Sequence, residues 1–225
     1  MLEAGLIDAA VVGGVDSLCH TTLYGFNSLE LVSSQACRPY DAQRDGISIG
    51  EGAAFGLLER LPTASAGDDI LLLGIGESSD AHHMSAPHPQ GLGARMAMAQ
   101  ALAGAGLTPA QIDYVNLHGT ATRSNDAAEG KAMLDLLPGV PCSSTKGATG
   151  HTLGAAGAIE AVICALALRH GLLPAGINTT EPDPELPLDY LLQNREQPVH
   201  RVLSNAFGFG GSNCSLLFGR ADSPG

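Results

Sequence analysis

Two histidines and one lysine stand in glycine-rich stretches where their side chains could act on a bound molecule. His118 lies in "LHGTAT", and Lys146 and His151 lie five residues apart in "TKGATGH". A histidine can donate or accept a proton near neutral pH, and a lysine carries a compact positive charge. The lysine and histidine could hold a phosphate, form a catalytic pair or belong to an ordinary loop.

The order of the residues argues against a phosphate or metal site. A Walker-type loop has its lysine directly after the last glycine, whereas Lys146 precedes the glycines. A later stretch, "GFGGSN", departs from GxGxxG because Asn213 stands where the final glycine belongs. The loop 80–88 contains an aspartate and three histidines, but adjacent histidines usually face different ways and no cysteine is near. We therefore expect neither a nucleotide nor a metal here.

Strands and helices alternate around these stretches. Apolar runs that end at glycine predict strands, and longer runs with polar or glycine ends predict helices. We expect strands at 9–18, 70–80, 112–119, 141–145, 202–211 and 212–220, and a further apolar segment at 46–60 after a polar loop. We expect helices at 91–107, 124–137 and about 153–169. This alternation with a closing hairpin predicts an α/β layered fold with a mixed sheet between helices.

Three polar stretches fall at the carboxyl ends of predicted strands, where ligands of α/β sheets gather. His118 ends the first, Lys146 and His151 end the second, and Phe207 and Phe209 end the third. Taken singly, each histidine is more often a structural residue than a catalytic one. The three stretches together predict one pocket, because their small residues leave room for a ligand to approach the backbone.

The composition limits the class of protein. The chain has 225 residues with 44% hydrophobic and 15% charged residues, and its net charge of −12 with no basic stretch argues against nucleic-acid binding. No run reaches the ~18 consecutive apolar residues of a membrane span, and the start shows no secretory signal. The five cysteines are scattered without CxxC spacing. We expect buried thiols in a reduced, cytoplasmic protein.

Several longer motifs resemble those of one family. They are "CRPYDAQRDGISIGEGA", "SAPHPQG", "HGTAT" followed by an aspartate and a glutamate, "STKGATGHTLGAAG" and "SNAFGFGGSN". The motifs resemble the β-ketoacyl-[acyl carrier protein] synthases of the type I and II elongating group, which includes polyketide ketosynthases. The resemblance implies a thiolase-like fold, layered α-β-α-β-α and here only partly present. It places the end of the amino-terminal half at 1–61, a linker at 62–69 and the carboxyl-terminal half at 70–225.

The resemblance implies catalytic roles for four of these side chains. His118 and His151 would polarise the malonyl thioester carbonyl and assist decarboxylation. A neutral imidazole can donate from one nitrogen, which suits an enolate oxygen. Lys146 would order the site by bonding to Glu129 and fixing the first histidine, without touching the substrate.

The resemblance also implies residues around the substrate. Thr120 and Thr122 match threonines that hold the pantetheine arm, and Phe207 lies beside them as a substrate-binding residue. Phe209 matches a gating phenylalanine that we count with the catalytic residues. We assign no metal ligand to catalysis and no cofactor, because the substrates are carried on phosphopantetheine. In some members a structural monovalent cation is surrounded by the residues that match Asn116, Glu160, Ser204 and Asn205.

The family's chemistry needs a nucleophilic cysteine in an elbow at a helix amino terminus, where its pKa falls. By resemblance this elbow lies outside the 225 residues. Cys142 begins a predicted strand and Cys37 sits in a loop, so neither fits the position. We expect the isolated chain to be inactive without a cysteine-bearing segment.

These features predict part of a 3-oxoacyl-[acyl carrier protein] synthase that performs decarboxylative Claisen condensation in fatty acid, polyene or polyketide synthesis. The expected partners are acyl carrier protein and either a missing amino-terminal segment or a second ketosynthase subunit, in a homodimer or heterodimer. An alternative is a non-catalytic partner similar to chain-length factors, and a third is an assembly module that folds only with a partner. "RSND" after "HGTAT" replaces the usual proline and glycine, which leaves the shape of the pantetheine channel and the substrate preference open.

Overall fold

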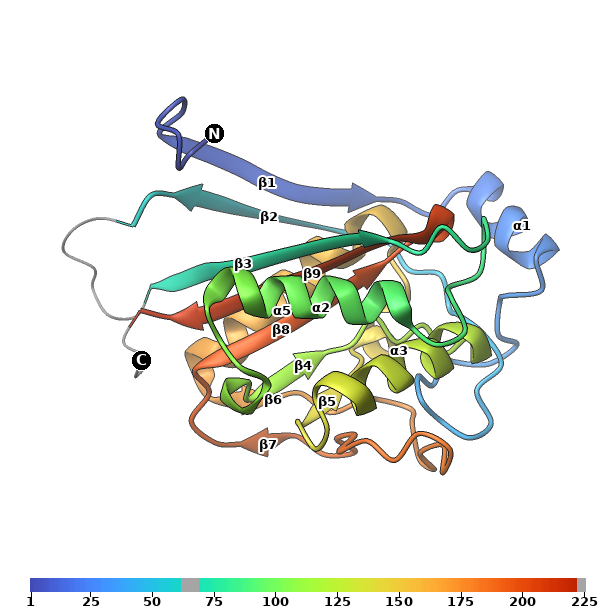
Figure 1. Cartoon of the computed structure of the whole chain (residues 1–225). Helices are drawn as coiled ribbons and strands as arrows, with labels where there is room; N and C mark the ends of the chain where they lie inside the picture. Colours follow the sequence, from blue (N-terminus) through green and yellow to red (C-terminus); the bar gives the residue numbers. More distant parts are fainter. Residues whose placement is uncertain (62–68, 222–225) are drawn as a thin grey trace.

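The computed structural model describes residues 1–61 and 69–221, and its largest sheet has five strands in the order β3-β9-β8-β4-β5 (Figure 1). The strands are β3 (Ile70–Ser79), β4 (Tyr114–Asn116), β5 (Cys142–Ser143), β8 (Arg201–Phe207) and β9 (Ser212–Arg220). Strand β9 is antiparallel to β3 and β8, whereas β4 is parallel to β8 and β5. The predicted mixed sheet and closing hairpin are confirmed.

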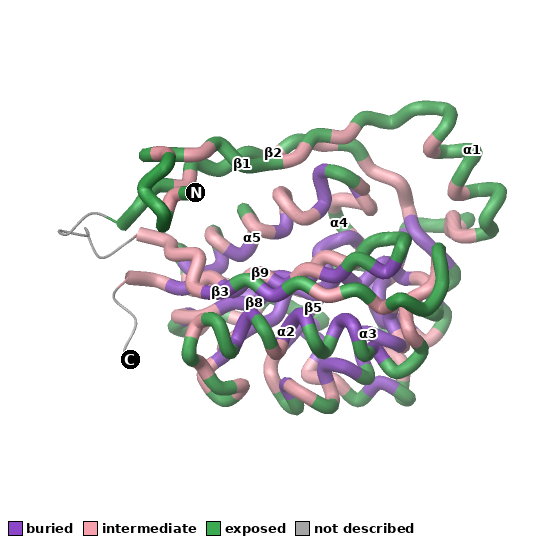
Figure 2. The backbone as a smooth tube through the Cα atoms, turned by 45° about the horizontal axis from the view of Figure 1, so that its top comes forward, coloured by how far each residue is buried: buried purple, intermediate pink, exposed green. Residues whose placement is uncertain are grey.

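Helices cover both faces of this sheet, as Figure 2 shows. Helices α2 (Leu92–Ala105) and α3 (Arg123–Leu136) lie on one face and α5 (Ala156–His170) lies on the other. Gly76 lets α2 approach β3, because an added Cβ would lie 1.8 Å from the carbonyl oxygen of Ala97. The core between the sheet and α2 and α3 includes Met98, Leu102, Val115, Leu117, Met133, Leu203 and Leu217. The core on the α5 side includes Tyr114, Cys164, Leu168 and Val202.

A second, two-stranded sheet lies on the far side of α5. It pairs β1 (Ala9–Asp16) antiparallel with β2 (Gly52–Glu59). Its apolar side chains are largely in solvent, and four of them are 61–73% exposed: Val11, Val15, Phe55 and Leu57. In Figure 2 this sheet is mostly green, whereas the purple segments lie in the five-stranded sheet, in its helices and in the loops around them. The layers therefore run β1–β2, α5, the five-stranded sheet, and then α2 with α3.

The shorter elements include some that the sequence did not predict. The polar loop after β1 contains α1 (His20–Ser28), which has no buried residue. Strands β6 (Leu172–Leu173) and β7 (Arg195–Glu196) form a further small sheet. The remaining short turns of helix are η1 (Pro109–Gln111), α4 (Lys146–Thr149), η2 (Leu153–Ala155) and η3 (Phe209–Gly211). The linker predicted at 62–69 lies, apart from its last residue, outside the described residues.

One helical stretch within the described residues is long and apolar enough to cross a membrane by length and composition alone. It runs from Leu153 to His170, and 33% of it is buried. The stretch includes α5, which packs against both sheets. A core helix has the same composition, so this stretch is weak support for a membrane span.

Candidate functional site

The carboxyl ends of three strands bring the predicted side chains together. Strands β4, β5 and β8 are parallel, so His118 after β4, Lys146 after β5 and Phe207 at the end of β8 meet at one edge of the sheet. The ring centroid of His118 lies 5.3 Å from that of His151 and 5.6 Å from that of Phe207. Gly119 adopts a left-handed φ of +37° beside Ser144, where a Cβ would lie 2.4 Å from the serine Cβ. A larger residue than glycine would push the His118 loop away from the strand end.

Lys146 is a buried cation at the centre of this cluster. Its side chain is 1% exposed, and Nζ donates to the carbonyl oxygen of His118 at 2.5 Å. The same nitrogen lies 3.3 Å from Nδ1 of His118 and forms an ion pair with Glu160 of α5. The predicted bond from Lys146 to Glu129 is therefore wrong, and Glu160 takes that place. The physical reason is that other donors already fill the acceptor sites of Glu129.

Glu129 is a buried carboxylate held by neutral donors. Oε1 accepts from the His118 N–H at 2.8 Å and from the Asn205 side-chain amide at 3.0 Å. Oε2 accepts from the Gly119 N–H at 2.9 Å and from the Tyr40 hydroxyl at 3.0 Å. Burial raises the pKa of Glu129, and these four donors stabilise its charged form. Glu129 thus fixes the backbone of the loop after β4, and all four of these hydrogen bonds are made within the protein.

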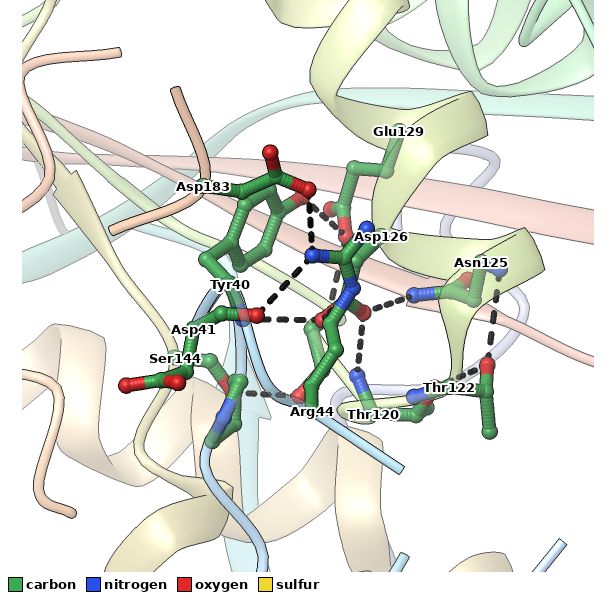
Figure 3. A network of polar contacts seen from close by, with 12 residues as sticks. Tyr40, Asp41, Arg44, Thr120, Thr122, Asn125, Asp126, Glu129, Ser144 and Asp183 are labelled. Carbon is green, nitrogen blue, oxygen red and sulfur yellow. Dashed lines mark hydrogen bonds and ion pairs between the residues drawn. The ribbon is translucent and has the colours of Figure 1, made fainter. Parts of the chain in front are cut away.

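A second buried carboxylate, Asp126, continues this network, which Figure 3 shows. Asp126 accepts from the backbone N–H groups of Thr120 at 3.0 Å and Tyr40 at 2.9 Å. The guanidinium of Arg44 lies 3.6 Å from Asp126 through Nε and 2.6 Å from Asp183 through Nη1. From the sequence, Asp126 was expected only to favour the amino end of its helix, and Tyr40 and Arg44 were not predicted to take part in the site. The available signals were two acids three residues apart on one helix and the motif "CRPYDAQRDG".

Both histidines are neutral in this environment. Burial, aided by the Lys146 charge, lowers the pKa of His118 well below its usual value and that of His151 to about 3. An ammonium has no acceptor, so Nδ1 of His118 must be the unprotonated nitrogen that faces Lys146. Nδ1 of His151 accepts from the Leu153 N–H at 3.3 Å. Each imidazole therefore carries its proton on Nε2 and can donate it in a hydrogen bond.

Two hollows meet at His118 and Phe207. One, of about 400 Å³, is lined by both histidines. The other, of about 60 Å³, is lined by His118, Thr120 and Phe209. A further hollow, of about 430 Å³ beside the end of α5, contains none of the predicted residues. The two histidines, Thr120, Phe207 and Phe209 therefore line a recess made of these two hollows, whereas Lys146 and Glu129 are buried behind it.

Two predicted residues, Thr122 and Phe209, are less buried than His118, and only Phe209 lines one of the two hollows. The Thr122 hydroxyl caps α3 by accepting from the Asn125 N–H at 3.4 Å, and it also shares a hydrogen bond of 2.9 Å with Thr120. Phe209 is 51% exposed, and its ring stacks on Phe26 of α1 at 5.7 Å between centroids. The sequence analysis missed Phe26 because residues 20–28 have the composition of a loop.

Comparison with known proteins assigns the chain to a family. Residues 71–180 match the family model of the β-ketoacyl synthase C-terminal domain, and residues 1–64 match that of the β-ketoacyl synthase N-terminal domain. The chain belongs to the β-ketoacyl synthase family. The resemblance drawn from the motifs is confirmed.

Relatives of this β-ketoacyl synthase chain are similar along almost all of its length. A mitochondrial 3-oxoacyl-[acyl-carrier-protein] synthase of Arabidopsis thaliana is 41% identical, over 97% of this chain and 51% of its own length. The structure of the ketosynthase ApeO in complex with its chain length factor ApeC from Xenorhabdus doucetiae matches with 49% identity and a TM-score of 0.92. That match covers 98% of this chain and 55% of the other. A type II polyketide synthase acyl-carrier protein in complex with its ketosynthase, bound to the hexaketide, matches with 28% identity and a TM-score of 0.91. It covers 98% of this chain and 58% of the other.

These comparisons confirm the α/β, thiolase-like fold class. The chain spans about half the length of the curated relatives it matches. In the described residues the main sheet has five strands, whereas β1–β2 has two.

Four of the five cysteines of this synthase chain have thiols whose pKa is raised by burial, and one of them, Cys214, lines the larger hollow. Cys142 is buried in β5, and burial raises the pKa of its thiol. Cys37 is also buried, its Sγ donates to the carbonyl oxygen of Lys146 at 3.1 Å, and burial raises its pKa. A nucleophilic thiolate needs a lowered pKa and access to substrate. Neither cysteine has the environment of a nucleophile.

Two of the residues that match the family's monovalent cation site have buried polar atoms without a hydrogen-bond partner in the part of the chain that the structure describes. Both side-chain polar atoms of Asn116 and Oε2 of Glu160 are buried without a hydrogen-bond partner among the described residues. Amide and carboxylate oxygens are suitable ligands for such a cation, so these two residues fit it. The Asn205 side chain does not, because it already bonds to Glu129 and Ser215. Within the described ranges no group of three histidine, cysteine or acidic side chains could hold a metal ion.

Proposed function

We propose that this chain forms part of a 3-oxoacyl-[acyl carrier protein] synthase that condenses an acyl thioester with a malonyl-carrier and releases CO₂. The observation that carries the proposal is the pair of neutral imidazoles on one hollow, each with a protonated Nε2. Two such donors suit an oxygen that gains negative charge during a reaction. Substrate chain length and pathway stay outside the proposal.

In the proposed reaction the thioester carbonyl oxygen of the malonyl group accepts hydrogen bonds from Nε2 of His118 and His151. The bond between the α-carbon and the carboxylate breaks, CO₂ leaves, and the electron pair forms an enolate whose oxygen the two N–H groups stabilise. The α-carbon then attacks the acyl thioester on the enzyme, forms the new C–C bond and releases the cysteine thiolate. Lys146 favours this sequence because its charge beside Nδ1 keeps His118 neutral and correctly oriented.

The nucleophilic cysteine belongs, in this proposal, to a segment outside the 225 residues. The exposed sheet β1–β2 supports it, since neither outer edge is paired with another strand in the described part of the chain. Its exposed large apolar side chains are valine, phenylalanine and leucine, which favour contact with another protein surface over water. That segment can be an amino-terminal part of the same protein or a second ketosynthase subunit, in a homodimer or heterodimer.

Acyl carrier protein is the proposed substrate carrier. One matching structure holds an acyl-carrier protein with its ketosynthase. Thr120, Phe207 and Phe209 line the smaller hollow beside His118, where a pantetheine arm would deliver its thioester. The substrates arrive on phosphopantetheine, so we propose no further cofactor. A cytoplasmic location also stays a prediction.

A non-catalytic, chain-length-factor-like role is the alternative, because one matching structure pairs a ketosynthase with such a factor. The presence of both histidines and of Lys146 favours the synthase. A glutamine in place of the nucleophilic cysteine in the partner segment would favour the alternative.

Malonyl decarboxylation by the assembled protein tests the proposed function. We expect His151→Ala to lower the rate by at least about 100-fold, since one oxyanion donor contributes about 10²–10³. His170→Ala is the matched control, because this histidine is exposed at the end of α5, and it should leave the rate within about twofold. An unchanged rate in His151→Ala, measured as acetyl-carrier formed, would remove the role proposed for this histidine.

A further inference from the structure

Tyr40 makes contact with both carboxylates that hold the catalytic loop. Its hydroxyl donates to Oε2 of Glu129 at 3.0 Å, and its backbone N–H donates to Oδ2 of Asp126 at 2.9 Å. The residue is 1% exposed and has a left-handed φ of +63°, which tyrosine rarely adopts. This backbone conformation turns the N–H and the side chain of one residue toward the same helix, α3 (Figure 3).

The same two carboxylates accept from three consecutive N–H groups of the loop after β4. Glu129 accepts from His118 and Gly119, and Asp126 accepts from Thr120. The Tyr40 ring also lies beside this loop, because a Cβ added at Gly119 would be 3.2 Å from its Cε2 atom. Tyr40 belongs to the segment before β2, far away in sequence from β4 and α3.

We propose that Tyr40 is a positioning residue for decarboxylation: its hydroxyl fixes Glu129, and Glu129 fixes the backbone that sets the direction of the His118 ring. The proposal rests on the proposed function for its kinetic consequence. The structural part of the proposal is that Tyr40 acts on the loop through Glu129, and this part can be tested without measuring activity.

The hydroxyl, and not the ring alone, carries this role. Glu129 has no cation within hydrogen-bonding distance among the described residues, and its donors are two backbone amides, one side-chain amide and the Tyr40 hydroxyl. A hydrogen bond to a buried charged group is stronger than one between neutral groups. Burial and the neighbouring carboxylates raise the pKa of Tyr40 well above its usual value, so the hydroxyl stays a donor.

Tyr190 provides a matched control in the same ring pair. Its ring packs against that of Tyr40 with centroids 5.3 Å apart, and it is also buried. Its hydroxyl makes only long bonds, to the Ser144 N–H at 3.4 Å and to the Thr179 hydroxyl at 3.5 Å. Tyr190→Phe thus removes a buried hydroxyl beside the network without touching either carboxylate.

The kinetic test compares Tyr40→Phe with Tyr190→Phe in malonyl-carrier decarboxylation by the assembled protein. We expect Tyr40→Phe to lower kcat about tenfold with KM within about twofold, and Tyr190→Phe to change kcat less than about twofold. In a Glu129→Gln background, adding Tyr40→Phe should cost less than about threefold, because the two residues act as one unit. A kcat for Tyr40→Phe within twofold of wild type, or a full tenfold loss in the Glu129→Gln background, would overturn the proposal.

A measurement without turnover separates failure of this proposal from failure of the proposed function. In NMR spectra of the purified protein, Tyr40→Phe should shift the backbone amide resonances of His118 and Gly119, and Tyr190→Phe should not. In the wild type the Tyr40 hydroxyl proton should exchange slowly with water, a result that needs no variant to fold. Unmoved amide resonances or a rapidly exchanging hydroxyl would contradict the positioning role. A wild-type protein that does not decarboxylate malonyl-carrier would contradict the proposed function alone.

Discussion

The molecule contains two antiparallel strand pairs that pack on opposite sides of α5, and they differ in what surrounds them. The pair β8–β9 has β4 and β3 on its outer edges, and its residues Val202, Leu203 and Leu217 are 0% exposed. The pair β1–β2 has no further strand on either edge among the described residues, and its apolar side chains face solvent. The first pair can therefore fix a site with residues of this chain, whereas the second presents a surface that another segment can cover.

This difference explains where the proposed site is complete. The two histidines, their lysine and both buried carboxylates come from the five-stranded sheet, α3 and the turns that follow β4 and β5. The loop between β1 and β2 contributes Tyr40 and Arg44. It also carries Cys19, which is exposed at the start of α1 and whose pKa is lowered by hydrogen bonds with Thr22, but Cys19 lines neither hollow beside the histidines.

Replacing Lys146 should have the largest effect, because the completed side of the molecule depends on its buried charge. Lys146→Met leaves the Glu160 carboxylate and the His118 carbonyl without their donor, and we expect the free energy of unfolding to fall by about 3–5 kcal/mol. Chemical denaturation measures this change. Lys131→Met on the exposed face of α3 is the control and should stay within about 0.5 kcal/mol. A Lys146 variant as stable as the control would show that the ion pair does not hold the site together.

A matched pair of leucines sharpens the comparison of the two strand pairs. Leu203 on β8 is 0% exposed and Leu57 on β2 is 61% exposed. In the chain alone we expect Leu203→Ala to cost about 2–5 kcal/mol and Leu57→Ala less than about 0.5 kcal/mol. When the cysteine-bearing segment is bound, the cost of Leu57→Ala should rise. An equal cost for the two variants in the chain alone would show that β1–β2 is not an open surface.

The neutral state of His151 predicts a smaller, pH-dependent effect. Its pKa is about 3 in the folded protein and about 6.5 when unfolded, so the unfolded chain takes up a proton that the folded chain does not. Stability from this group is therefore present above pH 6.5 and is lost as the pH falls toward 3, by about 1–2 kcal/mol between pH 7 and 5. The pKa of Glu160 is raised from 4.5 to about 7 in the folded protein, so the folded chain binds a proton that the unfolded chain does not. Between pH 7 and 5 this group therefore makes the protein more stable as the pH falls.

Comparing wild type with His151→Asn isolates the contribution of this histidine. The fall in urea stability from pH 7 to pH 5 should be smaller in His151→Asn, and His170→Asn should behave as wild type. If the loss of stability from pH 7 to pH 5 were the same in His151→Asn as in wild type, His151 would be protonated in the folded protein.

Much of the layered core and the identity of the recess residues followed from local patterns. Apolar runs that end at glycine predicted the strand ends near which His118, Lys146 and Phe207 lie. Because parallel strands place their carboxyl ends at one edge of a sheet, these residues were expected to lie together. The ion-pair partner of Lys146 could not be predicted from the sequence. Glu160 and Glu129 are both acids on helices, and only the packing of the helices decides which of them meets the lysine. Tyr40 and Arg44 were missed because their partners lie more than 80 residues away, on α3. Helix α1 was not predicted because its short sequence contains a glycine and two threonines, and no side-chain cap marks its start.

The location of the acyl group tests the central claim most directly, namely that this chain supplies the histidine site and another segment supplies the nucleophile. The assembled protein is incubated with acyl-carrier protein and its peptides are analysed by mass spectrometry. The account predicts an acyl adduct on a cysteine of the partner segment and none on the five cysteines of this chain, Cys19, Cys37, Cys142, Cys164 and Cys214. A stoichiometric adduct on Cys142 or Cys37 would contradict it.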